Sequence, residues 1–275
     1  MSLHWFPGHM HKAKQELEKV LPKIDVVIEV LDARAPYSSQ NPLLDTLLGS
    51  KPKVVILNKA DAADPNLTAQ WVDYFRAKNV RALPFNAMTG QGHHAIVQAC
   101  QKVVEESSSN KKRYSINVII VGIPNVGKSM IINKLKGRKV AKAENKPGVT
   151  RTQQWVEVSP QFFLLDTPGI LWPKFEVPHI GLTLASIGTL KDTIAEPEEV
   201  AQFICKILVK KYLQLLKNRY KLDTVPEPPF EIVELIGKKR GLLGTGGVVN
   251  VERTAILIIQ ELRTGKIGRV TFENP

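Results

Sequence analysis

The chain has 275 residues, of which 43% are hydrophobic, and it carries a formal net charge of +12. That length is enough for one domain of ordinary size with a smaller second one. Its longest apolar runs fall well short of the roughly 18 residues that a membrane span needs, and we find no apolar signal-peptide stretch, so we expect a cytoplasmic protein with no membrane partner.

Six short, apolar runs rich in β-branched residues predict strands, and helical patterns over 41–49, 67–78, 91–105 and 128–137 alternate with them. The runs are "DVVIEVLD", "KVVILN", "ALPFNA", "NVIIVG", "WVEVS" and "FFLLD". Runs that are apolar on both faces are typical of parallel strands, which need helices on both sides. We therefore expect an α/β fold with a six-stranded, mostly parallel sheet. A Ser-rich stretch at 105–115 is expected to be a linker.

From residue 178 onward the strand signal disappears and helical patterns take over. "EPEEVAQFICKILVKKYLQLLKNRY" predicts one long amphipathic helix, and "FEIVELIGKKRG" and "NVERTAILIIQELRTG" predict two more. Asn250 is the expected N-cap of the last one, and Gly265 follows its end. The Gly-rich "GLLGTGG" lacks the features of a phosphate loop and is expected to be a flexible loop. Residues 178–275 should thus form a small all-α domain.

The positive charge favours a polyanionic partner, although a basic surface can also serve solubility alone. Of the 38 basic and 26 acidic residues, residues 178–275 hold 14 and 11, which leaves 24 and 15 for residues 1–177. Two local clusters are candidates for phosphate contacts, or else are simply solvated faces. They are Lys134, Lys136, Arg138, Lys139, Lys142, Lys146 and Arg151, and then Lys206, Lys210, Lys211, Lys217, Arg219 and Lys221.

The two cysteines, Cys100 and Cys205, form no CxxC pair and have no metal-ligand spacing. We expect two buried, reduced thiols.

"GIPNVGKS" at 122–129 fits the G-x-x-x-x-G-K-[ST] pattern, follows a predicted strand and opens a predicted helix. Backbone N–H groups of such a loop cradle phosphates at a helix N-terminus. Lys128 is expected to reach the β and γ phosphates, and the Ser129 hydroxyl to ligate Mg²⁺. Met130 stands where many such loops carry a second hydroxyl, and it is expected to offer its backbone amide.

"LLDTPG" ends another predicted strand 37 residues beyond Ser129. Asp166 suits the magnesium shell, and Gly169 lets its backbone N–H approach a γ-phosphate. The intervening "KPGVTRT" offers Thr150 and Thr152 as the threonine that completes magnesium coordination. We favour Thr150, although the spacing does not separate the two.

"NKAD" at 58–61 follows the strand "KVVIL" and therefore lies at the carboxyl edge of the sheet, where α/β folds bind ligands. Asp61 can accept hydrogen bonds from guanine N1–H and N2–H₂, which adenine cannot supply. After the next strand, a backbone N–H at Asn86 or Ala87 is expected to bind guanine O6.

Together these motifs predict a GTP site, and its expected residues are Asn58, Lys59, Ala60, Asp61, Asn86, Ala87, Asn125, Val126, Gly127, Lys128, Ser129, Met130 and Gly169. The metal ligands are expected to be Ser129, Thr150 and Asp166.

In an ordinary GTPase the phosphate loop comes before the base-reading motif, whereas here the order is reversed. Cutting the sheet after "DTPG" and joining its old ends through the linker produces this order. That circular permutation predicts a GTPase domain over 1–177 with an N-terminal arm over 1–22. With "WFPGHM", "DAR.P" and "LDTPGILWPKF", the chain resembles the RbgA/YlqF family of circularly permuted GTPases. The resemblance implies a role in late assembly of the large ribosomal subunit, with its precursor and ribosomal RNA as partners of the C-terminal domain.

Ile170 follows "DTPG" at a position where Ras-like enzymes carry a water-orienting glutamine, so we expect slow intrinsic hydrolysis that ribosomal particles stimulate. His9 is a candidate to orient the water, and otherwise a surface or structural histidine. Asn125 resembles the asparagine by which related GTPases hold K⁺. Two alternatives to the assembly switch are a nucleotide-gated RNA-binding scaffold and a signalling GTPase with a protein effector.

Overall fold

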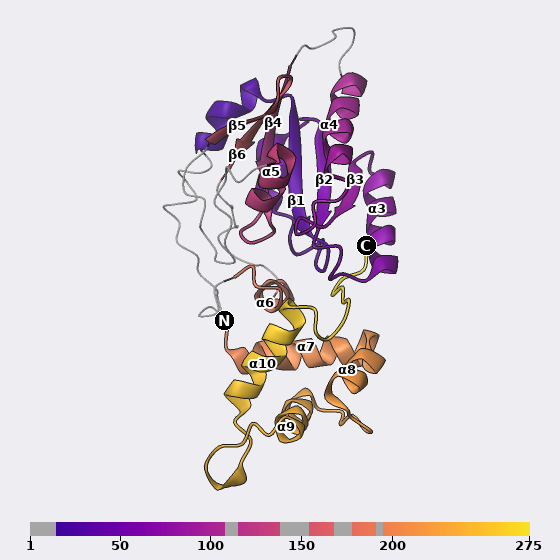
Figure 1. Ribbon diagram of the computed structural model, residues 1–275, viewed down its shortest axis with the longest axis vertical. Coiled ribbons are helices and arrows are strands. Elements are labelled where there is room, and N and C mark those ends of the chain that lie inside the picture. The colour runs from indigo at the N-terminus through magenta and orange to yellow at the C-terminus, as the bar shows by residue number, and fades with distance from the viewer. Residues whose placement is uncertain (1–14, 108–114, 138–153, 168–177, 191–194) are drawn as a thin grey trace.

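The computed structural model describes residues 15–107, 115–137, 154–167, 178–190 and 195–275. These residues form a sheet domain with a set of helices below it (Figure 1). Among them, no helix is long and apolar enough to cross a membrane.

The sheet has six strands in the spatial order β3-β2-β1-β4-β6-β5. All neighbours are parallel except β5 and β6, which are antiparallel. The predicted six-stranded, mostly parallel sheet is confirmed. Its strands are β1 (Val26–Asp32), β2 (Lys53–Asn58), β3 (Arg81–Phe85), β4 (Ile116–Val121), β5 (Gln154–Ser159) and β6 (Phe162–Asp166).

Every residue of β1 is buried, because alternate side chains enter different cores on the two faces of the sheet. Ile28, for example, packs with the side chains of α4 (His93–Ser107) and α5 (Lys128–Lys136). On the opposite face, Val27 packs beside α2 (Pro42–Leu48), and Leu31 packs beside α3 (Pro65–Ala77). Both faces are thus covered by helices, as the doubly apolar strands predicted.

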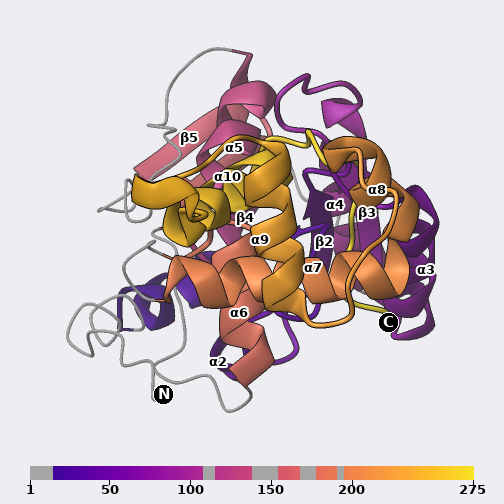
Figure 2. The ribbon, with the colours of Figure 1, turned by 90° about the horizontal axis from the view of Figure 1, so that it is seen from below.

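The helices below the sheet are α6 (Pro178–Ser186), α7 (Pro197–Lys211), α8 (Leu213–Tyr220), α9 (Pro229–Lys239) and α10 (Val251–Arg263) (Figures 1 and 2). The Asn250 side chain accepts a hydrogen bond from the Arg253 N–H at 2.9 Å, which confirms the predicted N-cap of α10. The Gly-rich segment contains a short 3₁₀ turn, η2 (Thr245–Gly247), and a single bridge pairs Leu243 with Val249.

The prediction of one long helix before residue 220 is wrong, because the helix breaks at Tyr212. The backbone of Tyr212 is not helical (φ −137°, ψ 38°). Its hydroxyl lies 3.1 Å from both the N–H and the carbonyl oxygen of Thr271, so it can accept from the first and donate to the second. A contact with a segment far along the chain therefore accompanies the change in helix direction, which helical periodicity alone cannot reveal.

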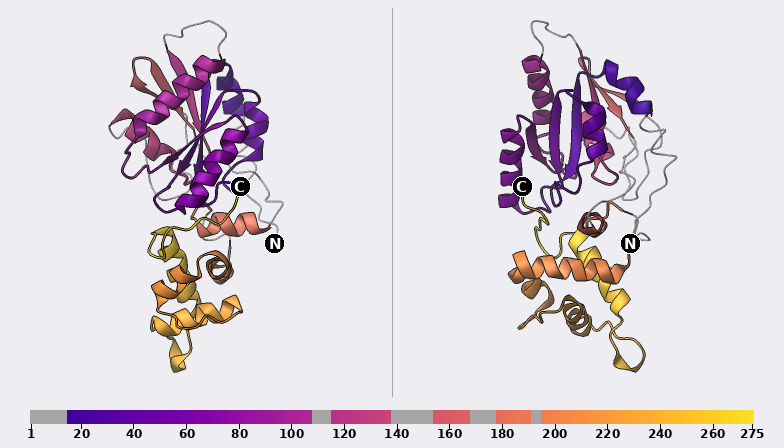
Figure 3. Two further views of the ribbon diagram at one scale, coloured as in Figure 1. Left: turned by 90° about the vertical axis from the view of Figure 1, so that its right-hand side faces the viewer. Right: turned by 180° about the vertical axis from the view of Figure 1, so that it is seen from behind.

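The last residues of the chain form an extended segment that returns to the sheet domain. We call residues 269–273 the C-terminal strap. The strap leaves the end of α10 and passes beside α7 and α8, and the C-terminus lies next to α3 (Figures 1 and 3). The strap was expected to belong to the helical domain, and its contacts with the sheet domain were not predicted.

Both cysteines are buried and free, as expected. Burial raises the pKa of the Cys100 and Cys205 thiols to about 12, so neither is poised for thiolate chemistry.

Candidate functional site

The loop from Gly122 to Lys128 joins β4 to α5 at the carboxyl edge of the sheet. Its Gly122 has φ +146°, and a Cβ there would lie 2.5 Å from the Val30 carbonyl oxygen. Gly127 has φ +100°, and a Cβ there would collide with the Asn58 side-chain amide. Both positions therefore require glycine. Val126 between them is fully buried and anchors the loop in the core.

The Lys128 side chain folds back over this loop. Its ammonium donates to the carbonyl oxygens of Gly122 at 3.1 Å and Ile123 at 3.0 Å. Burial lowers the pKa of Lys128 to about 8, and the nearby Asp166 carboxylate opposes that shift. The loop thus surrounds a buried cation, an arrangement suited to an anionic ligand.

Asp166 ends β6, and only 4% of it is exposed. Its Oδ1 has no hydrogen-bond partner within the part of the chain that the structure describes. Burial raises the pKa of Asp166 to about 6, while Lys128 and the Thr167 N–H oppose that shift. A buried carboxylate oxygen with no hydrogen-bond donor is suited to a hard cation such as Mg²⁺, which is commonly held by one or two protein oxygens together with phosphates.

Asn58 ends β2 and ties three loops together. Its side-chain N–H donates to the Val126 carbonyl oxygen at 2.7 Å, and its Oδ1 accepts from the Ala87 N–H at 3.1 Å. The structure therefore places the predicted phosphate, base-reading and Asn86–Ala87 loops side by side. The Ala87 N–H expected to bind guanine O6 already donates to Asn58, and the Met88 N–H donates to Asn86 Oδ1 at 2.8 Å.

Asp61 is exposed at this edge. The backbone on either side is held by the Ala60 N–H, which donates to the Phe85 carbonyl oxygen at 3.1 Å, and by the Ala62 N–H, which donates to the Lys59 carbonyl oxygen at 2.9 Å. The Asp61 carboxylate thus belongs to a turn whose flanking backbone groups are hydrogen-bonded.

Lys59 adopts a left-handed backbone conformation (φ 61°), and its ammonium lies 2.9 Å from Asp32 Oδ2. Asp32 is fully buried and also forms a two-pronged ion pair with Arg34, with N–O distances of 2.9 and 2.8 Å. Both cations outweigh burial and hold the pKa of Asp32 well below its usual range. This network therefore orients Lys59, within the predicted base-reading motif, from the neighbouring strand.

The phosphate loop is bonded directly to the helical part. The Asn125 side-chain N–H donates to the Gly188 carbonyl oxygen at 2.8 Å, and Arg34 donates to the Ile187 carbonyl oxygen at 3.1 Å. Both acceptors lie immediately after α6. The site is therefore built at the boundary between the sheet and the helices.

Comparison with known proteins agrees with this geometry. Residues 117–225 match the family model described as 50S ribosome-binding GTPase. The chain is 47% identical to ribosome biogenesis GTPase A of Bacillus cereus over 280 residues, which cover all of this chain and 95% of that relative. The chain belongs to the ribosome biogenesis GTPase A family. It is 33% identical to the Thermotoga maritima member, covering 99% of this chain and 95% of that one.

The crystal structure of GNP-bound YlqF from T. maritima has the same fold, with a TM-score of 0.68 and 30% identity, covering 96% of this chain and 98% of that one. A GDP-bound structure of the same protein also gives 0.68. The chain is thus a GTPase of the ribosome biogenesis GTPase A family with a circularly permuted P-loop domain, as the motif order predicted.

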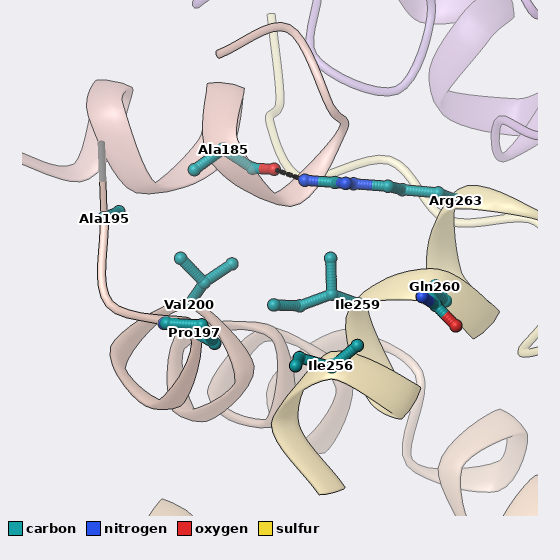
Figure 4. Close-up of a pocket in the computed structure, with 8 residues that line it drawn as sticks. All are labelled: Ala185, Ala195, Pro197, Val200, Ile256, Ile259, Gln260 and Arg263. Carbon is teal, nitrogen blue, oxygen red and sulfur yellow. Dashed lines mark hydrogen bonds between the residues drawn. The ribbon is translucent and has the colours of Figure 1, made fainter. Parts of the chain in front are cut away.

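A separate cavity of about 190 Å³ lies between α6, α7 and α10 (Figure 4). Its lining is mostly apolar, and the Arg263 guanidinium at its edge donates to the Ala185 carbonyl oxygen at 2.7 Å. None of the predicted nucleotide residues lines it, so this cavity is not the GTP site of the family.

The structure brings together most of the predicted site residues, since Asn58 links the phosphate loop to the loops that follow β2 and β3. Ser129 and Met130 lie in the first turn of α5. The predictions for His9, Thr150, Thr152 and Gly169 fall outside the described residues.

Sequence reasoning missed the roles of Asp32 and Arg34. "DAR.P" served only as a mark of family resemblance. One signal was available, because "LDAR" places two opposite charges at the end of a mostly apolar strand, at the same sheet edge as "NKAD". Such charges are buried only when they are paired.

Proposed function

We propose that this GTPase is a nucleotide-dependent switch in late assembly of the large ribosomal subunit, and that it binds the subunit's precursor and ribosomal RNA. The names of its relatives and the matching family description support the ribosomal role. The observation that carries the switch is the direct bonding of the phosphate loop to the helical part, through Asn125 and Gly188. A change from GTP to GDP can then alter the position of the helices relative to the sheet. Cytoplasmic localisation is part of the same proposal.

In this proposal Asp61 recognises guanine, and Lys128 neutralises the β and γ phosphates. Ser129, Asp166 and Thr150 would hold Mg²⁺, and the buried Asp166 oxygen that lacks a hydrogen-bond donor supports that role. When bound, the ion neutralises phosphate charge and orients the leaving group. Asn125 remains the candidate ligand for K⁺.

His9 is our candidate for orienting the attacking water. His9→Ala should leave GTP affinity nearly unchanged and lower turnover by roughly a hundredfold, since general-base or positioning groups contribute on this scale. Single-turnover hydrolysis on large-subunit particles would measure the effect, with His94→Ala on α4 as the matched control. Unchanged hydrolysis would remove His9 from the mechanism.

Within the second basic cluster, which begins at Lys206, some side chains are engaged in contacts inside the protein and others are exposed. Lys211 donates to the Phe272 carbonyl oxygen at 3.0 Å, Lys217 donates to the Asp223 carbonyl oxygen at 2.9 Å, and Arg219 pairs with Glu261. These three side chains serve internal contacts. By contrast, Lys206, Lys210 and Lys221 are exposed, and they are the better candidates for phosphate contacts.

Co-sedimentation with large-subunit precursor particles tests the proposal. A non-hydrolysable GTP analogue should tighten binding relative to GDP, and affinity should fall steeply with salt because phosphate contacts release counterions. Lys210→Glu should flatten the salt dependence by about one unit of logarithmic slope.

Lys102→Glu, an exposed change of equal charge on α4, is the matched control and should leave the slope unchanged. Equal affinity with both nucleotides would contradict the switch. Salt-insensitive binding would instead contradict the RNA contact and would favour a protein effector. A particle that binds without stimulating hydrolysis would favour the scaffold interpretation.

A further inference from the structure

The C-terminal strap lies across the two loops that follow β1 and β2. The Val270 N–H donates to the Ala62 carbonyl oxygen at 3.0 Å, and the Phe272 N–H donates to the Arg34 carbonyl oxygen at 2.8 Å. Between them, the Thr271 hydroxyl accepts from the Asp64 N–H at 3.0 Å. The strap thus satisfies backbone groups of both loops at the edge where the base-reading motif lies.

Arg269, at the start of the strap, spans the base-reading turn. Its Nη2 donates to the Ala60 carbonyl oxygen and its Nε donates to the Ala63 carbonyl oxygen, each at 2.9 Å. These two acceptors bracket Asp61. A planar guanidinium with two fixed donors can hold both carbonyls at a set separation, which a single ammonium cannot do.

The strap is also fastened on its other side. The Tyr212 hydroxyl contacts both backbone groups of Thr271, and the rings of Phe203 and Phe272 stack with centroids 6.0 Å apart. Gly268, just before the strap, has φ +126°, and a Cβ there would lie 2.9 Å from the Leu215 side chain. Helices α7 and α8 thus fix the position from which Arg269 reaches the base-reading turn.

We propose that Arg269 is a positioning residue for guanine recognition, which fixes the backbone around Asp61 so that its carboxylate can meet both guanine donors at once. The proposal rests on the assignment of Asp61 as the base-reading residue. The exposed Asp61 carboxylate must accept from N1–H and N2–H₂ together, and that pairing needs a turn already held in the bound geometry. Guanine affinity should therefore depend on the position of helices α7 and α8 relative to the sheet domain.

The test compares GDP with inosine diphosphate, whose base lacks the 2-amino group. Arg269→Ala should weaken GDP binding about fivefold, the effect of losing roughly one net hydrogen bond. Inosine diphosphate should lose about twofold or less, because it offers Asp61 only one donor. The ratio of GDP affinity to inosine diphosphate affinity should therefore fall. Arg269→Lys should recover part of the ratio, since lysine can reach one of the two carbonyls.

Arg253→Ala is the matched control, because Arg253 is an exposed arginine on α10 whose side chain forms no described contact with the base-reading turn. A general loss of stability would reduce the fraction of active protein without changing the GDP to inosine diphosphate ratio. An unchanged ratio in Arg269→Ala would therefore overturn the proposal. Asp61→Asn, measured alongside, separates the two failures: if it too leaves base preference unchanged, the site assignment itself is wrong, and the positioning role is lost with it.

Discussion

Replacing Lys128 by alanine should lower GTP affinity by on the order of a thousandfold, because it removes the buried cation of the phosphate loop and about two charged hydrogen bonds. In the described structure the Lys128 ammonium lies on the carbonyl oxygens of Gly122 and Ile123, already inside the loop. Little rearrangement is needed for it to meet phosphates. Titration with a fluorescent GTP analogue measures the loss.

Lys136→Ala provides the matched control, since Lys136 lies at the other end of α5 and the substitution changes the charge equally. The ligand-free Lys128→Ala protein should unfold within a few degrees of the original chain. Burial disfavours the charged form of this lysine and thereby lowers its pKa. Removing the side chain relieves that cost but leaves the carbonyls of Gly122 and Ile123 without a donor. Retained GTP binding by a folded Lys128→Ala variant would contradict the assignment of the phosphate loop.

The sheet could be predicted because its strands are short runs made mostly of apolar, β-branched residues, and in β1 every residue is buried. Helical patterns of ordinary length separate most of these runs, and the shortness of the runs favours strands over buried helix segments. The phosphate loop could be predicted because its backbone requires glycine at two fixed positions, Gly122 and Gly127, and that spacing can be recognised in the sequence. The Gly127 backbone passes so close to Asn58 that a side chain cannot fit.

The contacts that join the two parts could not be predicted, since they depend on residues far apart in the sequence. Arg34 donates to Ile187, and Arg269 donates to Ala60 and Ala63. A lone arginine in a loop carries no periodicity, and its acceptors are backbone carbonyls, which leave no trace in the sequence. The break at Tyr212 has the same origin, because its hydroxyl binds Thr271.

These contacts converge on the loops that follow β1 and β2. Asp32 holds Lys59, and Arg34 connects the same network to the end of α6. The strap adds a second connection from α7 and α8. The segment that follows α6 is therefore bonded both to the phosphate loop, through Asn125, and to the Asp32–Arg34 network. The strap connects the turn around Asp61 to α7 and α8 as well, so this turn has a second connection that the phosphate loop lacks among the described contacts.

Asp61→Asn should lower GTP affinity by on the order of a hundredfold and improve the binding of xanthosine triphosphate. The carboxylate can accept from both guanine donors, whereas an amide presents a donor to one of them and leaves it unpaired. Xanthine carries an oxygen where guanine carries its 2-amino group, and that oxygen can accept from the new amide. Competition titrations with the two triphosphates measure the reversal.

Asp73→Asn is the matched control, because Asp73 is an exposed aspartate on α3 and the substitution removes the same charge. It should leave both affinities unchanged, which excludes a general electrostatic effect. The decisive quantity is the ratio of the two affinities, since the lost carboxylate acts on the base alone while Lys128 and the phosphate loop hold either triphosphate equally. If ATP competed as well as GTP with the original chain, or if Asp61→Asn left that ratio unchanged, guanine would have to be recognised by groups other than Asp61.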